Sequence, residues 1–299
     1  MNADLPTTIP AYLERLRAAL AGCDPAMAQD ALYDAEEYLR SELTANPGKS
    51  EAEVISSVAG SYGAPDEVAD IYRETEVKVQ TALRAPAPAP RKSLAGQFFG
   101  VLVDPQTYGA LFYMLLALAT GTFYFTWVVT GASLSAGLAV LIIGIPFVIL
   151  FIGATRILAL VEGRIVEVML GERMPRRPLY TDRNQPVLKR IGAMFTDPRT
   201  WGTMLYFLAM LPLGVAYFTV AVTGLSLSLG FIAAPITTVL GYGDHVTVWN
   251  GLTVQQAPWL GVLLPVLGLL VLFATLHLAR FVGRMHGRLA KAMLVSSPG

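Results

Sequence analysis

The chain has 299 residues, of which 54% are hydrophobic and only 15% are charged. Such an apolar composition excludes an ordinary soluble globular protein and indicates that much of the chain lies in a membrane. The formal net charge of zero hides a division, because residues 1–83 carry 15 acidic and 6 basic residues and the remainder carries 7 and 16. The sequence therefore predicts an acidic water-soluble domain followed by a membrane domain with basic flanks.

Residues 1–84 are predicted to form a cytoplasmic helical domain. Apolar residues recur at helical spacing in the first helix, and Asp24 before Pro25 is typical of the start of a second. Ser50 and Glu53 have the spacing of a capping box, in which each side chain bonds the backbone N–H of the other residue. The second helix carries acidic residues that we expect mostly on its outer face: Asp30, Asp34, Glu37 and Glu42.

Residues 85–103 are predicted to connect this domain to the membrane. The alternating Ala–Pro run at 85–90 favours a semi-rigid extended spacer. Residues 91–103 have the pattern of an amphipathic segment on the inner membrane face, with Phe98, Phe99 and Leu102 as anchors.

An internal repeat is the clearest feature of the membrane domain. The motif Asp-Pro-x-Thr-aromatic-Gly occupies 104–109 and returns at 197–202, and the match continues without a gap to 135 and 228. Roughly half of these paired positions are identical, which is far more than two apolar segments share by chance. Arg156 corresponds to Arg280 at an offset of 124 residues instead of 93, so the second copy contains an insert. We therefore predict two tandem membrane hairpins, at 104–190 and 191–299.

Each copy contains two apolar stretches with the length of about 20 residues that a bilayer requires. The predicted spans are about 108–130 and 136–160, joined by a tight turn, and about 201–223 and 259–281. No Lys or Arg occurs between Lys92 and Arg156, or between Arg199 and Arg280. By the positive-inside rule both termini and the basic connector are cytoplasmic. We expect an all-α protein with a cytoplasmic helical bundle domain and a four-helix transmembrane bundle.

The stretch 229–240 is apolar enough for a fifth span, but a fifth crossing would place the basic C-terminal segment outside. We therefore predict an outer loop insert at about 229–257. Within it, Pro235 favours a break, and 229–240 is left open as a re-entrant segment, an interfacial segment or an extension of the preceding helix.

Two parts of the chain resemble known bacterial families. Gly63-Ala64-Pro65-Asp66-Glu67-Val68-Ala69, with Ala35-Glu36-Glu37-Tyr38-Leu39, resembles the DUF1700/HAAS helical domain. Asp197-Pro198-Arg199-Thr200-Trp201, Pro212-Leu213-Gly214-Val215 and the tail from His286 to Ala290 resemble the four-helix "putative sensor" domain of some histidine kinases and stand-alone proteins. The resemblance implies a bacterial inner-membrane location and a sensing or relay role without a reaction. Because HAAS-type proteins often accompany PadR-like transcription regulators, it also implies a cytoplasmic regulator as partner.

Three groups of residues are candidate binding sites. Asp244, His245 and Trp249 form either a ligand site on the outer loop or a plain polar loop, and two ligand types without a third predict no metal. Tyr124, Tyr217, Gly121 and Gly214 either pack the repeat core or line a lipid-sized cleft. Arg156, Arg173, Arg176, Arg177 and Arg280 form a basic face for anionic lipid or for docking the acidic helical domain.

Two aspartates have a simpler expected role. Asp104 and Asp197 each precede a proline at the start of a predicted span, so we expect each to cap its helix.

The leading hypothesis is a membrane sensor that passes an envelope, lipid or ligand signal to a cytoplasmic regulator through its helical domain. The alternative is a small transporter or channel, with the helical domain as a gating or structural appendage. We expect no catalytic residues and no cofactor, since the sequence shows no nucleophile–base pair or phosphate loop. Expected partners are membrane lipids and the regulator, without direct nucleic-acid binding, and a homo-oligomer is left open.

Overall fold

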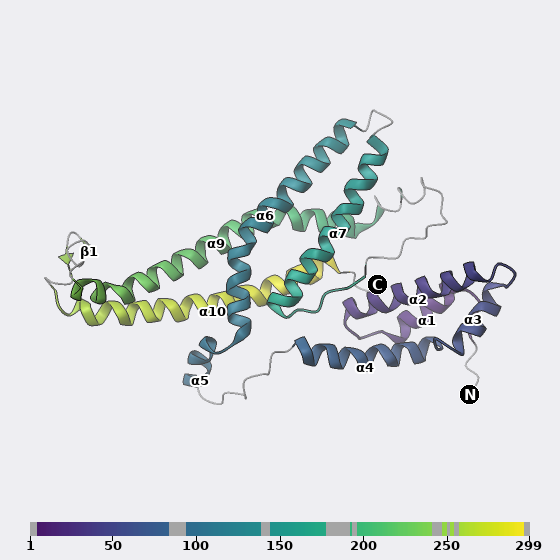
Figure 1. Cartoon of the computed structure of the whole chain (residues 1–299), viewed down its shortest axis with the longest axis horizontal. Helices are drawn as coiled ribbons and strands as arrows, with labels where there is room; N and C mark the ends of the chain where they lie inside the picture. Colours follow the sequence, from purple (N-terminus) through teal and green to yellow (C-terminus); the bar gives the residue numbers. More distant parts are fainter. Residues whose placement is uncertain are drawn as a thin grey trace. The chain divides into compact units, whose positions relative to one another are not determined.

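The computed structural model of the chain describes residues 5–83, 94–138, 144–177, 192, 196–240, 247–249, 252–253 and 257–295 (Figure 1). The regular elements among these residues are helices apart from one short antiparallel pair of strands, which confirms the predicted all-α fold class. Internal contacts divide the chain into two units. Unit 1 contains Met1–Ala85, Val128–Tyr206 and Gly287–Gly299, and unit 2 contains Pro86–Trp127 and Phe207–His286.

The helical domain at the start of unit 1 consists of α1 (Ile9–Ala19), α2 (Pro25–Ala45), α3 (Glu51–Ala59) and α4 (Pro65–Leu83). Helix α1 packs against both α2 and α4, and a shared apolar core forms between the four helices. The fully buried members of this core include Tyr12, Leu16, Leu39 and Ile55.

The helix starts of this domain follow the predicted capping chemistry. The Asp24 carboxylate accepts a hydrogen bond from the Ala26 N–H at 2.9 Å. Ser50 and Glu53 form the complete capping box at the start of α3, with the Ser50 N–H donating to Glu53 Oε2 at 2.8 Å. After α1 the chain turns at Gly22, whose φ of 82° lies in the left-handed region that glycine tolerates best.

Within the described residues, four helices are long and apolar enough to cross a membrane: α6 (Pro105–Leu138), α7 (Gly144–Leu170), α9 (Pro198–Val239) and α10 (Leu260–Leu294). The predicted spans 201–223 and 259–281 fall almost entirely within α9 and α10. In α6 and α7 the outcome differs from the expectation. Helix α6 continues through 131–135, so the predicted tight turn there is wrong, and 139–143 lies outside the described residues.

The apolar start of the insert after the third span is helical. Helix α9 runs unbroken to Val239 and contains Pro212 and Pro235, so of the three forms left open for 229–240 the helix extension is the one observed up to 239. Proline is tolerated in long apolar helices because neighbouring groups and small local adjustments satisfy the freed carbonyl. At 1.5 Å per residue, the 42 residues of α9 span about 63 Å, well beyond a hydrocarbon core of about 30 Å.

A short helix precedes the membrane helices in unit 2. Helix α5 (Leu94–Phe99) is followed by the 3₁₀ turn η1 (Gly100–Leu102). The Phe98 ring lies 4.7 Å from the ring of Phe273 on α10, and the Phe98 carbonyl lies 3.2 Å from His277 Nε2. The aromatic anchor predicted at Phe98 therefore packs against a helix of the same unit.

Candidate functional site

Aspartates at the start of α6 and α9 make the same two interactions. In unit 1, Asp197 accepts a hydrogen bond from the backbone N–H two residues on, at 3.1 Å, and pairs with Arg156 Nη2 at 3.0 Å. In unit 2, Asp104 accepts the corresponding N–H at 3.1 Å and pairs with Arg280 Nη2 at 2.8 Å. Each aspartate therefore caps its helix as predicted, and it also neutralises an arginine that the sequence assigns to a basic face.

A second equivalent contact joins the same pairs of helices. In unit 1, the Tyr206 hydroxyl donates to Glu162 Oε1 at 2.9 Å. In unit 2, the Tyr113 hydroxyl lies 2.6 Å from His286 Nε2. The sequence repeat relates position 113 to 206 and position 162 to 286, so the same contact occurs twice with a different partner. All four side chains are buried, which makes each contact a specific link between its two helices.

The four residues of the predicted inter-repeat cleft all lie in unit 2. A Cβ atom added to Gly121 would collide with the Met210 carbonyl, and one added to Gly214 would collide with the Ala117 carbonyl. The two helix backbones are therefore in direct contact, as small residues allow in membrane helices.

The aromatic members of this group are also packed. Tyr124 stacks on Phe207 with ring centroids 4.3 Å apart, and the Tyr217 hydroxyl lies 3.4 Å from His286 Nδ1. At the described residues of the α6–α9 crossing these contacts agree with the packed core, and the lipid-sized cleft stays a prediction.

Arg173, in the connector after α7, is the centre of a buried charged cluster in unit 1. Its side chain is 8% exposed and faces three carboxylates. Nη2 lies 3.2 Å from Asp30 Oδ2, Nε lies 3.3 Å from Glu76 Oε2, and Nη1 lies 3.3 Å from Glu167 Oε1. Asp30 and Glu76 belong to α2 and α4 of the helical domain, whereas Glu167 belongs to α7. One arginine therefore joins the helical domain to the membrane helix.

The connector backbone and the end of α10 add further contacts to this interface. The N–H groups of Arg176 and Arg177 donate to Asp30 Oδ1 at 2.7 and 2.8 Å. Lys291 Nζ lies 2.6 Å from Asp24 Oδ2 and 2.9 Å from Glu172 Oε1. Two separate segments of the membrane domain thus bind the acidic face of α2.

Burial and charge act against each other in this cluster. Burial raises the pKa of Asp30 above its ordinary value, while the Arg177 and Arg176 N–H groups and the Arg173 guanidinium oppose that rise. Burial acts to lower the pKa of Arg173, but the charges of Glu76, Asp30 and Glu167 together raise it. Removing either partner of such a buried pair leaves the other charge without compensation, which costs more than the intact pair contributes.

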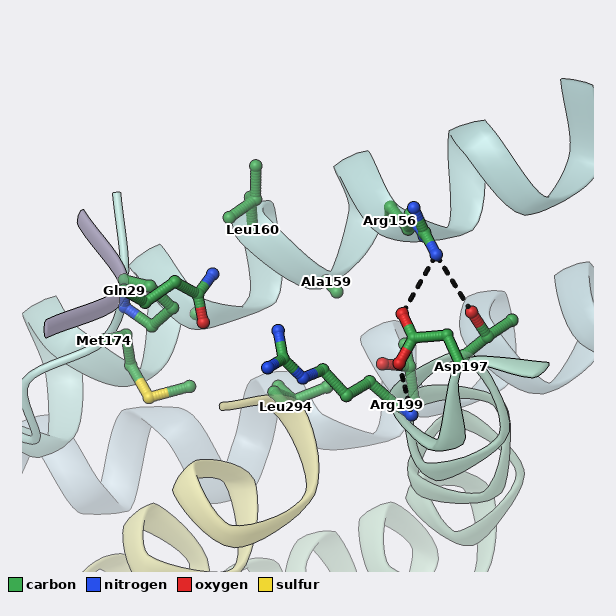
Figure 2. Close-up of a pocket in the computed structure, with 12 residues that line it drawn as sticks. Gln29, Arg156, Ala159, Leu160, Met174, Asp197, Arg199 and Leu294 are labelled. Atoms are coloured by element: carbon green, nitrogen blue, oxygen red, sulfur yellow. Dashed lines mark hydrogen bonds and ion pairs between the residues drawn. The ribbon is translucent and has the colours of Figure 1, made fainter. Parts of the chain in front are cut away.

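A pocket lies beside this cluster in unit 1, between the start of α9, α7, the connector and α2 (Figure 2). Its empty volume is about 570 Å³, including the part open to solvent. Arg156 bonds Thr200 and Asp197 at one end of the pocket. Figure 2 shows the Arg156–Asp197 contact at that end and the Gln29 amide reaching into the other end. The wall between them is formed mainly by apolar or small side chains: Ala159, Leu160, Gly163, Met174, Pro175 and Leu294.

The sequence predictions at the site have unequal outcomes. Arg173, Arg176 and Arg177 lie against the helical domain, where Arg177 also pairs with Asp34 at 3.0 Å. Sequence reasoning missed the roles of Glu76 and Lys291. Asp244 and His245 lie outside the described residues, and Trp249 ends strand β1 (Thr247–Trp249), which pairs with β2 (Leu252–Thr253). The ligand site predicted on that loop stays a prediction.

The helices and the site together define an all-α, multi-pass membrane protein with a helical domain outside its apolar helices. The chain belongs to the family described as "Putative sensor", which matches residues 113–294, well over half of its length. The match covers most of the four apolar helices and the connector, and it leaves the HAAS resemblance of the first helices a prediction. Comparison with curated proteins and with solved structures returned no match.

Proposed function

We propose that this protein is a noncatalytic membrane sensor whose output is the docking state of its N-terminal helical domain. The observation that carries the proposal is the burial of Arg173 among Asp30, Glu76 and Glu167. Because these carboxylates come from both the helical domain and α7, any stimulus that shifts α7 or the connector alters the contacts that hold the domain.

The energetics of the cluster suit a switch. Bringing four charged groups out of water costs several kcal/mol per ion, and the attraction between them repays much of that cost. The free-energy difference between the docked and released states is therefore small compared with the desolvation cost and with the attraction between the charges. A stimulus needs to supply only a few kcal/mol of differential binding to move such an equilibrium from mostly docked to mostly released.

Release would expose a surface suited to a basic partner. The docked face presents Asp24, Asp30 and Asp34 on α2 and Glu76 on α4, and each of these carboxylates now contacts a basic residue of the membrane domain. A cytoplasmic regulator with a basic surface would compete with the connector for this face, since complementary charge selects partners and speeds their encounter. The PadR-like regulator suggested by the HAAS resemblance is the candidate of this kind.

The proposal is tested by comparing partner recovery from three forms of the full chain in native membranes. Arg173→Ala removes the central charge. Arg176→Ala is the matched control in the same connector, because its side chain is 49% exposed and 3.8 Å from Glu167. Crosslinking through residues 5–83 should recover more of one cytoplasmic regulator from Arg173→Ala than from the wild type or the control. Equal recovery from all three forms, or recovery of lipids and copies of the chain alone, would contradict the proposal.

A further inference from the structure

The pocket beside the Arg173 cluster contains a buried guanidinium nitrogen that has no hydrogen-bond partner among the described residues. This nitrogen is Arg199 Nη1. The Asp197 carboxylate is already engaged, because it pairs with Arg156 and accepts the Arg199 backbone N–H. A buried guanidinium nitrogen without an acceptor costs free energy comparable to a lost charged hydrogen bond, so a ligand that supplies an acceptor gains that amount.

An unsatisfied acceptor lies at the other end of the same pocket. Gln29 Nε2 donates to the Arg177 carbonyl at 2.9 Å, and this contact fixes the orientation of the amide. Its Oε1 atom is buried and has no partner within the described ranges. In Figure 2 the Gln29 amide and the Arg199 guanidinium extend towards each other from opposite sides of the pocket. The pocket therefore offers one charged donor and one neutral acceptor to a single small group.

The remaining lining determines the kind of molecule that fits. Arg156 is neutralised by Asp197, so Arg199 gives the pocket a surplus of one positive charge. Leu160, Met174 and Leu294 provide an apolar wall beside this charge. The pocket also lies at the first turn of α9 and on α7 near residue 160, where the apolar spans predicted from the sequence begin and end. A group at this position meets both the lipid headgroup region and water.

We propose that this pocket binds a phosphate ester that carries a hydroxyl group. The phosphate oxygens accept from Arg199 Nη1, and the hydroxyl donates to Gln29 Oε1. An anionic phospholipid headgroup with a glycerol hydroxyl and a free glycerol phosphate share this chemistry. Because Gln29 belongs to the helical domain, the ligand binds the docked state more tightly than the released state and stabilises docking by linkage. This regulatory consequence rests on the proposed function, whereas the binding itself does not.

The test uses the full chain in lipid nanodiscs of phosphatidylcholine, with and without phosphatidylglycerol. Native mass spectrometry of the protein after its ejection from the nanodiscs counts the lipids that stay bound to the wild type, to Arg199→Gln and to Arg288→Gln. Arg288 is an exposed arginine on α10, and its variant controls for loss of one positive charge. Arg199→Gln should leave the fold intact, because Nη1 has no protein partner among the described residues. We expect retention of phosphatidylglycerol that is about ten- to a hundredfold weaker in Arg199→Gln and unchanged in Arg288→Gln.

One further measurement distinguishes a phospholipid headgroup from a soluble phosphate ester, and a second variant tests the Gln29 contact. If free glycerol phosphate binds the protein in pure phosphatidylcholine with the same loss in Arg199→Gln, the ligand is a soluble phosphate ester. Gln29→Glu keeps the acceptor and adds a negative charge, so it should weaken binding of either anion. Equal retention by the wild type and Arg199→Gln, or no preference for either phosphate ester over phosphatidylcholine, would overturn the assignment.

Protease protection of residues 5–83 is measured in the same samples. If protection is strong but independent of the phosphate ester, the ligand assignment fails and the docking proposal stands. If the ester binds through Arg199 but protection is absent in every form, the docking proposal fails, and with it the part of the site that Gln29 supplies.

Discussion

Replacing Arg173 with alanine tests the energetics of the buried cluster. The guanidinium is 8% exposed and contacts Asp30, Glu76 and Glu167 at 3.2–3.3 Å. Removing one partner from a buried ion pair typically costs about 3–5 kcal/mol, because the remaining charges stay desolvated. Under the docking proposal the helical domain separates instead, so that Asp30 and Glu76 regain water. The cost therefore appears as a shift of the docking equilibrium towards the released state and not as unfolding of the helical domain.

We expect the docked-to-released ratio to fall by at least about a hundredfold in Arg173→Ala, since each tenfold change corresponds to about 1.4 kcal/mol. In Arg176→Ala the change should be under about fivefold, because an exposed pair contributes only about 0–1 kcal/mol. Limited proteolysis of the full chain in lipid with a nonspecific protease measures the ratio through the digestion rate of residues 5–83. Similar digestion rates for the wild type and Arg173→Ala would refute the reasoning, as would equally fast digestion of both variants.

Two further predictions concern packing and capping. Gly121→Ala should destabilise unit 2 by about 1–3 kcal/mol, because the new methyl group would collide with the α9 backbone, whereas Gly230→Ala has open space and should have little effect on the thermal midpoint in detergent. Ser50→Ala should reduce the free energy of opening of α3 by about 1 kcal/mol in amide hydrogen exchange. Hydrogen bonds from the Ser50 N–H and hydroxyl lower the pKa of Glu53, so its stabilisation of α3 is present above the unfolded-state pKa and is lost as the pH falls through the folded-state value. Glu53→Gln should remove this pH dependence, and α3 exchange that loses protection equally in both forms would contradict it.

Local signals in the sequence were sufficient for the helix starts. Asp24 and the pair Ser50 and Glu53 were recognisable because a cap involves residues only two or three positions apart. The aspartate caps of α6 and α9 were recognisable for the same reason. Their ion pairs with Arg156 and Arg280 were not, although the repeat places one such aspartate and one such arginine in each copy. The presence of one aspartate and one arginine at equivalent positions of both copies was the signal from which these ion pairs could have been predicted.

Helix ends and tertiary contacts were harder to predict. The stretch from Gly131 to Ser135 is rich in small residues, which suit a turn in water. Such residues also continue a helix within an apolar environment, and α6 extends to Leu138. Pro235 favours a break in a water-exposed helix, because proline removes a backbone hydrogen bond, but α9 continues through it. The partnership of Arg173 with Glu76 joins positions 97 residues apart, and nothing local to either residue indicates it.

The most direct test of the account is a zero-length crosslink in the unmodified chain. Lys291 Nζ lies 2.6 Å from Asp24 Oδ2, so a carbodiimide should join the end of α10 to the start of α2 in native membranes. Mass spectrometry should find the Asp24–Lys291 peptide in the wild type and in Arg176→Ala, and should find it strongly reduced in Arg173→Ala. Absence of the link in the wild type, or an undiminished link in Arg173→Ala, would contradict the claim that Arg173 holds the helical domain against the membrane helices.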